Sequence, residues 1–355
     1  MSPPAPDGMH AFVAAATANG AGGQLAIKAV ARHMVLFGVP GVVALPTQAG
    51  YALQFPEGPT YVTRRHLPAV LGELIGSRAN RHALYVGMSD RLPLLRRSKV
   101  SVMVAQNPHL YGPRTVESIS RQRVRWVVLR RWAQWSLRRA AWVVVATSAT
   151  KDDIVGSSPL DPARIVVRPI PPQDIPPPKL GQEPCIGRLL LLGDVYSYKR
   201  FDWAVREIDH WATTRNLSPE VSHVGQLCDP VASRSLAVAA QDCASARVRF
   251  LGPLGHPEAL GQLRASDLLV FPSSRESFGL PLAEALAVGV PTLCSDLPQF
   301  HEIAGPAARY FRSAGGSIEA ALDDCSAPEV REEMARLGLA RVTADAGWDV
   351  FSPPA

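Results

Sequence analysis

The sequence predicts an α/β protein built from two parallel-sheet domains. In both halves of the 355-residue chain, short runs of aliphatic and β-branched residues alternate with longer helical patterns. A proline-rich stretch separates the halves, and a chain of this length exceeds what one compact core usually holds. We expect two Rossmann-like domains facing across a shared cleft, because ligands bind beyond the carboxyl ends of parallel strands.

The predicted strands are short and are bounded by glycine, proline or polar residues. In the first half they are HAFVAAA (10–16), GVVAL (41–45), HALYVG (82–87), VSVMVA (100–105) and WVVVAT (142–147). In the second half they are RLLLLGD (188–194), VSHVG (221–225), RVRFLG (247–252), DLLVFPS (267–273) and VPTLCS (290–295).

Residues 169–184, PIPPQDIPPPKLGQEP, contain seven prolines, which neither a helix nor a central strand accommodates. This segment predicts a linker that would act as a hinge. Charge changes there too: residues 1–180 hold 22 Lys and Arg against 9 Asp and Glu, whereas 181–355 hold 15 against 22. The expected division is a domain over 1–168, the linker, a domain over 185–345 and a tail over 346–355. The segment PEVREEMARLGLARVTADAGWDVF (328–351) predicts a helix that returns to the first domain.

Composition excludes several classes of protein. No run of about eighteen uncharged apolar residues occurs, so no membrane span is predicted. The N-terminal stretch lacks the basic start of a signal peptide, so we do not expect export. The five cysteines are odd in number and show no Cys-x-x-Cys spacing for zinc or redox chemistry. We expect structural cysteines in a reducing cytoplasm.

Two glutamates lie eight positions apart in the stretch 273–296, SSRESFGLPLAEALAVGVPTLCSD. Pro281 suits the first turn of a helix, which places Glu276 in the preceding loop and Glu284 about one turn inside the helix. The amides around Phe278, Gly279 and Leu280 would be free donors at the helix N-terminus, a position that favours a phosphate. The carboxylates could accept hydrogen bonds from a ribose diol and from sugar hydroxyls. The combination suits a nucleotide sugar.

The pattern E-S-F-G-L-P-L-A-E-A-L-A-x-G-x-P resembles the donor-site motif of glycosyltransferase family 4, whose members are retaining enzymes of the GT-B fold. ANGAGGQLAIKAVARHM (18–34) resembles the family's first glycine loop and helix, and LLLLGDVYSYKRFDWAV (189–205) resembles the segment that opens its second domain. RVRFLGPLGHPEALGQLRASDLLVFPS (247–273) resembles its base-binding region. The resemblance covers most of residues 10–348.

The resemblance implies catalytic roles for Glu276 and Lys199, with Lys199 contacting the donor diphosphate. The implied donor-binding residues are Gly22, Gly23, Lys199, Arg200, Glu276, Phe278, Gly279, Leu280 and Glu284. Physically, Lys199 and the helix-terminal amides would stabilise charge that develops on the leaving nucleoside diphosphate. No Asp-x-Asp occurs in the sequence, so we expect no metal and no cofactor beyond the nucleotide-sugar co-substrate.

Two departures from the family pattern affect this interpretation. Where many members have Gly-Arg before the lysine, this chain has Gly193-Asp194, and the sequence does not decide whether Arg200 replaces the missing cation. Where many members carry an active-site histidine, the chain has Gln106, Asn107 and, after a proline, His109. These three are the acceptor-side candidates, and an ordinary loop histidine is the alternative for His109.

A dinucleotide-dependent dehydrogenase is a rival interpretation of GAGG after the first strand. The third glycine position is Leu25, however, and GVVALPT ends without the acidic residue that would hold a ribose diol.

The segment SISRQRVRWVVLRRWAQWSLRRAAW (118–142) supports a second rival, because its seven arginines and four tryptophans suit an anionic membrane surface or a lipid-linked substrate. The arginines fall on several faces of a helical wheel, so a partly buried helix with snorkelling arginines is the alternative. No nucleic-acid recognition motif occurs, and we expect no nucleic-acid partner.

The sequence therefore predicts a retaining hexosyltransferase that transfers a sugar from a nucleoside diphosphate donor to an acceptor hydroxyl. The base, whether UDP, GDP or another, and the sugar are left open. The acceptor could be an envelope glycan, a lipid-linked sugar or a natural-product scaffold. We expect a cytoplasmic protein, with peripheral contact at the inner face of the membrane as an option.

Overall fold

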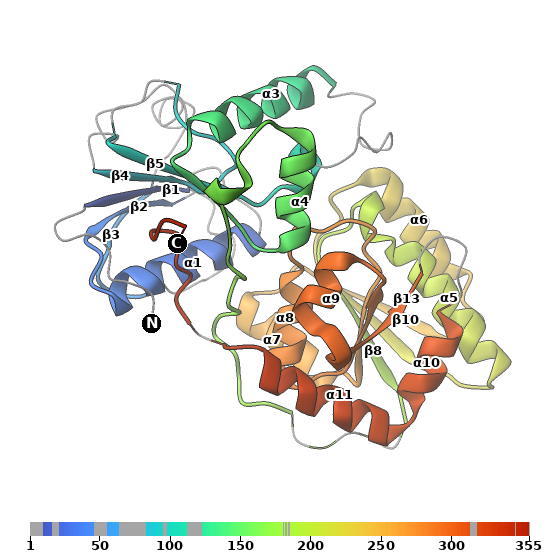
Figure 1. Ribbon diagram of the computed structural model, residues 1–355. Helices are drawn as coiled ribbons and strands as arrows, with labels where there is room; N and C mark the ends of the chain where they lie inside the picture. Colours follow the sequence, from blue (N-terminus) through green and yellow to red (C-terminus); the bar gives the residue numbers. More distant parts are fainter. Residues whose placement is uncertain are drawn as a thin grey trace. The chain divides into compact units, whose positions relative to one another are not determined.

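The structure, a computed structural model, describes residues 10–15, 21–45, 55–63, 83–94, 98–111, 123–179, 181, 183, 185–312, 318–344 and 346–354. The chain divides into two compact units (Figure 1). The first comprises Met1–Gln173 with Asp345–Ala355, and the second comprises Asp174–Ala344. The division between Gln173 and Asp174 falls inside the proline-rich segment.

In the first unit, the described strands form a seven-stranded parallel sheet in the order β3-β2-β1-β4-β5-β6-β7. The first six strands thus have the Rossmann order 3-2-1-4-5-6. Helices α1 and α3 lie on opposite faces of this sheet (Figure 1). The strands are β1 (Ala11–Ala14), β2 (Gly41–Leu45), β3 (Thr60–Thr63), β4 (Leu84–Gly87), β5 (Val100–Ala105), β6 (Trp142–Val145) and β7 (Ile165–Val167). The helices are α1 (Ala21–Leu36), η2 (Pro108–Leu110), α3 (Arg123–Arg139), α4 (Ser148–Ser157) and η4 (Pro162–Arg164).

The second unit repeats this plan with a six-stranded parallel sheet in the order β10-β9-β8-β11-β12-β13. Its strands are β8 (Arg188–Leu192), β9 (Glu220–Val224), β10 (Arg247–Gly252), β11 (Leu268–Phe271), β12 (Thr292–Ser295) and β13 (Ala308–Phe311). Its helices are η5 (Ser197–Lys199), α5 (Phe201–Thr214), α6 (Pro230–Gln241), α7 (His256–Ala265), α8 (Leu280–Val288), α9 (Pro298–Ala304), η6 (Gly305–Ala307), α10 (Glu319–Ser326) and α11 (Pro328–Arg341).

Both faces of the second sheet are buried, which explains why its strands read as continuous apolar runs. Along β8, Leu189 and Leu191 pack in a core shared with α5, α6 and α10. The alternate residues Leu190 and Leu192 pack in another core shared with α7, α8 and α9. This alternation follows from the two-residue period of a strand.

The predicted fold class is confirmed, and each of the strands predicted above is present. The predictions missed β3, β7 and β13, which are the edge strands of the two sheets other than β10. The predicted helix over 328–351 was too long, since α11 ends at Arg341.

After α11 the described residues 346–354 pack on the first unit in non-helical conformation. The Trp348 ring is 2% exposed, its Nε1 donates to the Arg168 carbonyl at 2.9 Å, and its amide donates to the Ala29 carbonyl at 2.9 Å. Asp349 pairs with the Arg168 guanidinium at 3.2 Å. Burial lowers the pKa of His33, which stacks against Phe351. The tail thus fastens the end of the chain to α1 and to the residue that follows β7.

The start of the second unit is held by Asp267, whose side chain is 2% exposed. Its carboxylate accepts from the amides of Gly187 and Arg188 at 3.1 and 2.8 Å, from the Arg188 guanidinium at 3.0 Å and from Lys179 Nζ at 3.3 Å. Burial acts to raise the pKa of Asp267, but these hydrogen bonds and charges lower it below its ordinary value. The carboxylate therefore joins the proline-rich segment to the beginnings of β8 and β11.

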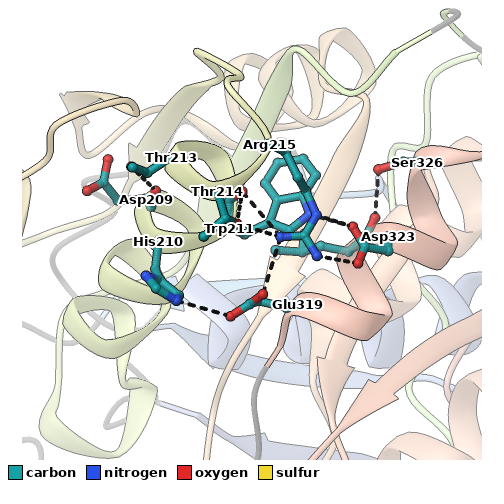
Figure 2. A network of polar contacts seen from close by, with 10 residues as sticks. Asp209, His210, Trp211, Thr213, Thr214, Arg215, Glu319, Asp323 and Ser326 are labelled. Carbon is teal, nitrogen blue, oxygen red and sulfur yellow. Dashed lines mark hydrogen bonds and ion pairs between the residues drawn. The ribbon is translucent and has the colours of Figure 1, made fainter.

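A polar network ties the last turn of α5 to α10 (Figure 2). The buried Trp211 donates from Nε1 to Asp323 at 2.9 Å, and the Arg215 guanidinium contacts both Asp323 and, at 3.2 Å, Glu319. His210 lies 3.4 Å from Glu319. Parallel-sheet ligands bind where strands end and the next helices begin, so this network at the end of α5 is structural.

Candidate functional site

The loop between β11 and α8 places the two glutamates as the sequence predicted, with Glu276 in the loop and Glu284 one turn inside the helix. Gly279 is the N-cap of α8 and has a φ of +101°. A Cβ at this position would meet the rings of Phe300 and Phe271 at 3.0 and 3.2 Å. The turn therefore requires glycine both for its left-handed backbone and for space.

The N-terminus of α8 presents unused backbone donors. Among the described residues, no backbone hydrogen bond uses the amides of Phe278, Gly279 or Leu280 as donors. Pro281 occupies the second position of the helix, where its missing N–H costs nothing. These amides and the helix dipole together favour an anionic group.

Lys199 and Glu276 come together at the carboxyl ends of β8 and β11. The Lys199 Nζ lies 2.5 Å from Glu276 Oε1, and their side chains are 11% and 15% exposed. The ammonium also lies 5.0 Å from the centroid of the Phe271 ring. Lys199 is therefore a buried, paired cation and is not the solvated lysine that an ordinary helix start would carry.

Hydrogen bonds to backbone carbonyls join the two loops that carry this pair and tie the Glu276 loop to α9. Ser274 donates from its amide to the Tyr198 carbonyl at 2.8 Å, and Gln299 donates from Nε2 to the Glu276 carbonyl at 2.9 Å. Burial, with the charge of Glu276, raises the pKa of the Tyr198 hydroxyl well above its usual value, so this tyrosine stays neutral. The Tyr198 ring stacks on that of Tyr196 with centroids 5.6 Å apart.

Glu284 has a different partner. Its Oε1 lies 2.9 Å from Nε2 of His256, the first residue of α7, and the side chains are 6% and 9% exposed. The Nδ1 of the same ring lies 3.8 Å from Asp174 in the proline-rich segment. Sequence reasoning missed His256, although a histidine that starts a helix soon after a strand lies where ligand-binding residues gather.

Asp194 and Arg200 occupy opposite ends of the loop after β8. Asp194 Oδ1 accepts from the amide of Gln226 at 2.9 Å, which ties this loop to the one after β9. Arg200 has a φ of +53° and holds its guanidinium 4.7 Å from the centroid of the Trp203 ring, in the first turn of α5. Asp194 thus ties the loop after β8 to the loop after β9.

The acceptor-side candidates belong to the first unit and follow β5. Asn107 caps η2 by accepting from the His109 amide at 3.0 Å, and His109 meets the edge of Trp126 with ring centroids 6.1 Å apart. Gln106 has a buried Nε2 without a hydrogen-bond partner among the described residues. Gly22 and Gly23 lie in the first turn of α1, and the preceding residues 16–20 fall outside the described ranges.

Asp90 organises this region and was not predicted. It is 5% exposed and has a φ of +59°. Its Oδ1 accepts from the amides of Gln106 and Asn107 at 2.7 and 3.1 Å and from the Tyr111 hydroxyl at 2.8 Å. Burial raises the pKa of Asp90 against the lowering effect of these bonds. An acidic residue just beyond the predicted strand 82–87 was the available signal.

Three further features concern metal ligands, disulfides and membrane-spanning helices. In the described part of the chain, no cluster of three or more His, Cys, Asp or Glu side chains could hold a metal ion. The five cysteines form no disulfide. None of the described helices has the length and apolar character needed to cross a membrane.

Comparison with known proteins finds relatives of the segment that carries this site. Residues 187–324 match the family model described as glycosyl transferases group 1. Glycogen synthase of Mycobacterium tuberculosis (strain CDC 1551 / Oshkosh) is 36% identical over 111 residues, which are 29% of this chain and 26% of that protein. Phosphatidyl-myo-inositol mannosyltransferase of Propionibacterium freudenreichii subsp. shermanii is 35% identical over 115 residues, covering 30% and 29%. The chain therefore matches between a quarter and a third of the length of these curated relatives.

Solved structures are similar over nearly the whole chain. The glycosyltransferase WaaG, involved in lipopolysaccharide biosynthesis, aligns over 98% of this chain and 97% of its own with a TM-score of 0.64 and 16% identity. HepE of Anabaena, in complex with UDP-glucose, aligns over 94% and 95% with a TM-score of 0.62 and 13% identity. At sequence identities this low, the structural similarity shows the fold alone. The second unit thus carries a match to the group 1 glycosyl transferases, and the chain as a whole has the GT-B fold of these structures.

Proposed function

We propose that this glycosyltransferase transfers a hexose from a nucleoside diphosphate-sugar to an acceptor hydroxyl with retention at the anomeric carbon. The observation that carries the proposal is the buried Lys199–Glu276 pair beside a helix N-terminus with unused amides. The donor class agrees with the UDP-glucose complex of HepE.

The geometry supports leaving-group stabilisation by charge. An ammonium has three N–H donors, so the contact of Lys199 with Glu276 leaves two for phosphate oxygens. The amides of Phe278, Gly279 and Leu280 add fixed dipoles that need no reorganisation during the reaction. Together these groups would neutralise the departing diphosphate without an acid from the protein, and we propose that no metal ion takes part.

The two glutamates have separate proposed roles. Glu284, deep in α8, would accept from the ribose of the donor. Glu276, held beside Lys199, would face the transferred sugar, where positive charge develops at the anomeric carbon. Gly22 and Gly23 would approach the diphosphate from the first unit, and Gln106, Asn107 and His109 would face the acceptor.

A thermal-shift panel of UDP, GDP, dTDP and NAD tests the donor class. A ligand present at a hundred times its dissociation constant stabilises the folded state by about 2.7 kcal/mol, which is readily measured. We expect a shift with at least one nucleoside diphosphate and none with NAD. Transfer activity with the corresponding sugar donors should survive EDTA. A shift with NAD alone would support the dehydrogenase, and activity lost on chelation and restored by Mg²⁺ or Mn²⁺ would refute the metal-free site.

The exposed face of α3 supports a second proposal, peripheral contact with an anionic membrane at the cytoplasmic face. Val127 and Val128 are 46% and 54% exposed, and Arg131, Arg138 and Arg139 are exposed as well. At 100° per residue these five positions fall within about one third of the helix circumference. The buried face holds the small or apolar residues Ala133, Ser136 and Leu137.

Sedimentation with vesicles separates membrane contact from a merely solvated helix. We expect retention on vesicles containing phosphatidylserine at low salt and release near 0.5 M salt. Replacing Val127 and Arg131 with serine should abolish retention, whereas the same changes at the exposed Val231 and Arg234 of α6 should not. Wild-type protein that ignores such vesicles would exclude this role.

A further inference from the structure

The hydrogen-bond ladder between β8 and β9 changes partners where β8 ends. The Gly193 amide donates to the Val224 carbonyl at 2.8 Å, as in a regular parallel ladder. In that pattern the Gly193 carbonyl would accept from the Gln226 amide, but this amide donates to Oδ1 of Asp194 at 2.9 Å. The Gly193 carbonyl instead lies 3.0 Å from Nε2 of His223. Two side chains, those of Asp194 and His223, thus replace one backbone hydrogen bond.

His223 belongs to β9 and is 1% exposed. Its ring meets those of Phe201 and Phe250 edge-on, with centroids 5.2 and 6.0 Å away. Burial lowers the pKa of His223, so the ring is neutral at neutral pH. Because a carbonyl only accepts hydrogen bonds, the single proton of the ring must be on Nε2. Nδ1 is buried without a hydrogen-bond partner among the described residues, so the polar function of this side chain is its bond to Gly193.

The contact with His223 sets the direction of the next amide. The peptide between Gly193 and Asp194 is trans, so its N–H points opposite to its C=O and away from β9. The other neighbour of β8 is β11, and the loop after β11 carries Glu276. The Lys199 Nζ lies 3.7 Å from the position that a Cβ on Gly193 would occupy. Among the described residues, none accepts a hydrogen bond from the Asp194 amide.

A second contact holds the same peptide. Gly225 follows β9 and has a φ of +149°. A Cβ at this position would overlap the Gly193 carbonyl oxygen and would lie 2.9 Å from the Asp194 nitrogen, so the peptide packs where no side chain fits. This close packing and the hydrogen bond from His223 together keep the peptide in one orientation.

We propose that His223 is a positioning residue that directs the Asp194 amide toward the donor diphosphate, so that a backbone N–H takes the place of the cation that the family resemblance implies there. This inference rests on the proposed donor class. Because an amide carries no net charge, it adds a hydrogen-bond donor without repelling the neighbouring ammonium of Lys199. An N–H that is held in advance also needs no reorganisation when charge develops on the leaving group. Without His223, the Gly193 carbonyl loses its partner and the peptide is no longer fixed.

Isothermal titration calorimetry on the full chain tests the role of His223, with UDP, GDP or dTDP, whichever binds. A hydrogen bond to a charged group contributes about 1.5–3 kcal/mol, so His223→Leu should weaken nucleoside diphosphate binding by about tenfold or more, or about 1.4 kcal/mol or more. In His223→Gln the side-chain amide can donate as Nε2 does, and affinity should stay within threefold of wild type. His33→Leu is the matched control, because it replaces another buried histidine, in the first unit, and should also stay within threefold.

Nuclear magnetic resonance observes the Asp194 amide directly. In protein made with isotope-labelled aspartate, the Asp194 signal is identified by comparison with Asp194→Asn. Its amide proton should move downfield when the nucleoside diphosphate is added, because the N–H then donates to a charged phosphate oxygen. The same titration with His223→Leu should give a much smaller change, and with His223→Gln a change like that of wild type.

Each outcome supports or overturns the inference. If His223→Gln binds as weakly as His223→Leu, the ring serves packing alone and the inference is wrong. If His223→Leu keeps its affinity, or the wild-type Asp194 signal does not move, the amide does not contact the diphosphate, and the inference is wrong while nucleoside diphosphate binding stands. If His223→Leu does not fold, the wild-type signal still decides. If no nucleoside diphosphate binds to the wild-type protein, the proposed function itself fails.

Discussion

Replacing Lys199 with methionine removes a charge from the candidate site while keeping most of the side-chain volume. Loss of one preorganised donor from such a site lowers the rate by about 10²- to 10³-fold, or about 2.7–4 kcal/mol of transition-state stabilisation. The structure predicts a second effect. Glu276 lies 2.5 Å from Nζ and is 15% exposed, so the variant leaves a largely buried carboxylate unpaired. Breaking a buried pair costs about 3–5 kcal/mol of stability, and the residual exposure places this case at the lower end.

A double-mutant cycle with Glu276→Gln separates the two effects. Lys199→Met combined with Glu276→Gln removes the unpaired charge, so the thermal unfolding temperature should recover while the transfer rate stays low. Single-turnover transfer, or donor hydrolysis where no acceptor is known, measures the rate. Lys151→Met is the matched control, because Lys151 is also partly buried but, among the described residues, its Nζ bonds only to the Ile165 carbonyl at 3.2 Å in the first unit. If Lys199→Met loses stability but keeps its rate within threefold of wild type, Lys199 only supports Glu276 and the leaving-group argument is wrong.

Four substitutions test separate parts of the structure. Glu284→Ala should mainly raise the donor KM, whereas Glu276→Gln should lower kcat by about a hundredfold or more with near-normal nucleoside diphosphate binding. Titration with the nucleoside diphosphate and single-turnover kinetics measure the two effects. If Glu276→Gln weakens nucleotide binding and Glu284→Ala does not, the two proposed roles are exchanged. The pKa of Asp267 is lower in the folded state than in the unfolded state. Asp267 therefore stabilises the fold at pH values above its unfolded-state pKa of about 4, and this stabilisation is lost as the pH falls through its folded-state pKa. Asp267→Asn should therefore lower the melting temperature at pH 7, and the difference in melting temperature from wild type should be smaller at pH 3. A difference that does not change with pH would contradict this. Trp348→Ala should destabilise the first unit by about 3–5 kcal/mol, seen as faster amide exchange in α1, and unchanged exchange there would show that the tail contributes nothing.

The sequence predicted the central strands because each is apolar on both faces and ends at glycine, proline or a polar residue. It did not reveal the edge strands β3, β7 and β13, which are three or four residues long. Edge strands pair on one side only and are often short, so their patterns are weak. The limits of α11 were missed for a different reason. The sequence after Arg341 remains compatible with a helix, and tertiary contacts of Trp348 decide its conformation.

At the candidate site, local pattern was sufficient for Glu276, Glu284 and Gly279, whose positions depend on one strand, one turn and one helix. It could not supply their partners, because these come from distant segments: Lys199 lies 77 residues before Glu276, and His256 lies 28 before Glu284. Such pairs depend on which strands become neighbours in the sheet. The adjacency of β8 and β11, which are separated by two strands in the sequence, brings Lys199 to Glu276.

In the proposed donor site, Asp194 stands where the family resemblance would place a cation, and this bears on how the leaving group would be stabilised. Asp194 is bound to the Gln226 amide, and the Lys199 charge is already balanced by Glu276. Under the proposed function, the positive end of α8 and its free amides would therefore carry a larger share of the stabilisation than they would beside an arginine. These donors are backbone groups at a turn whose left-handed φ and close contacts with Phe300 and Phe271 favour glycine, so their placement depends on Gly279. A change such as Gly279→Ala would displace the amides through the contact with Phe300 and would weaken the leaving-group site without altering its charge.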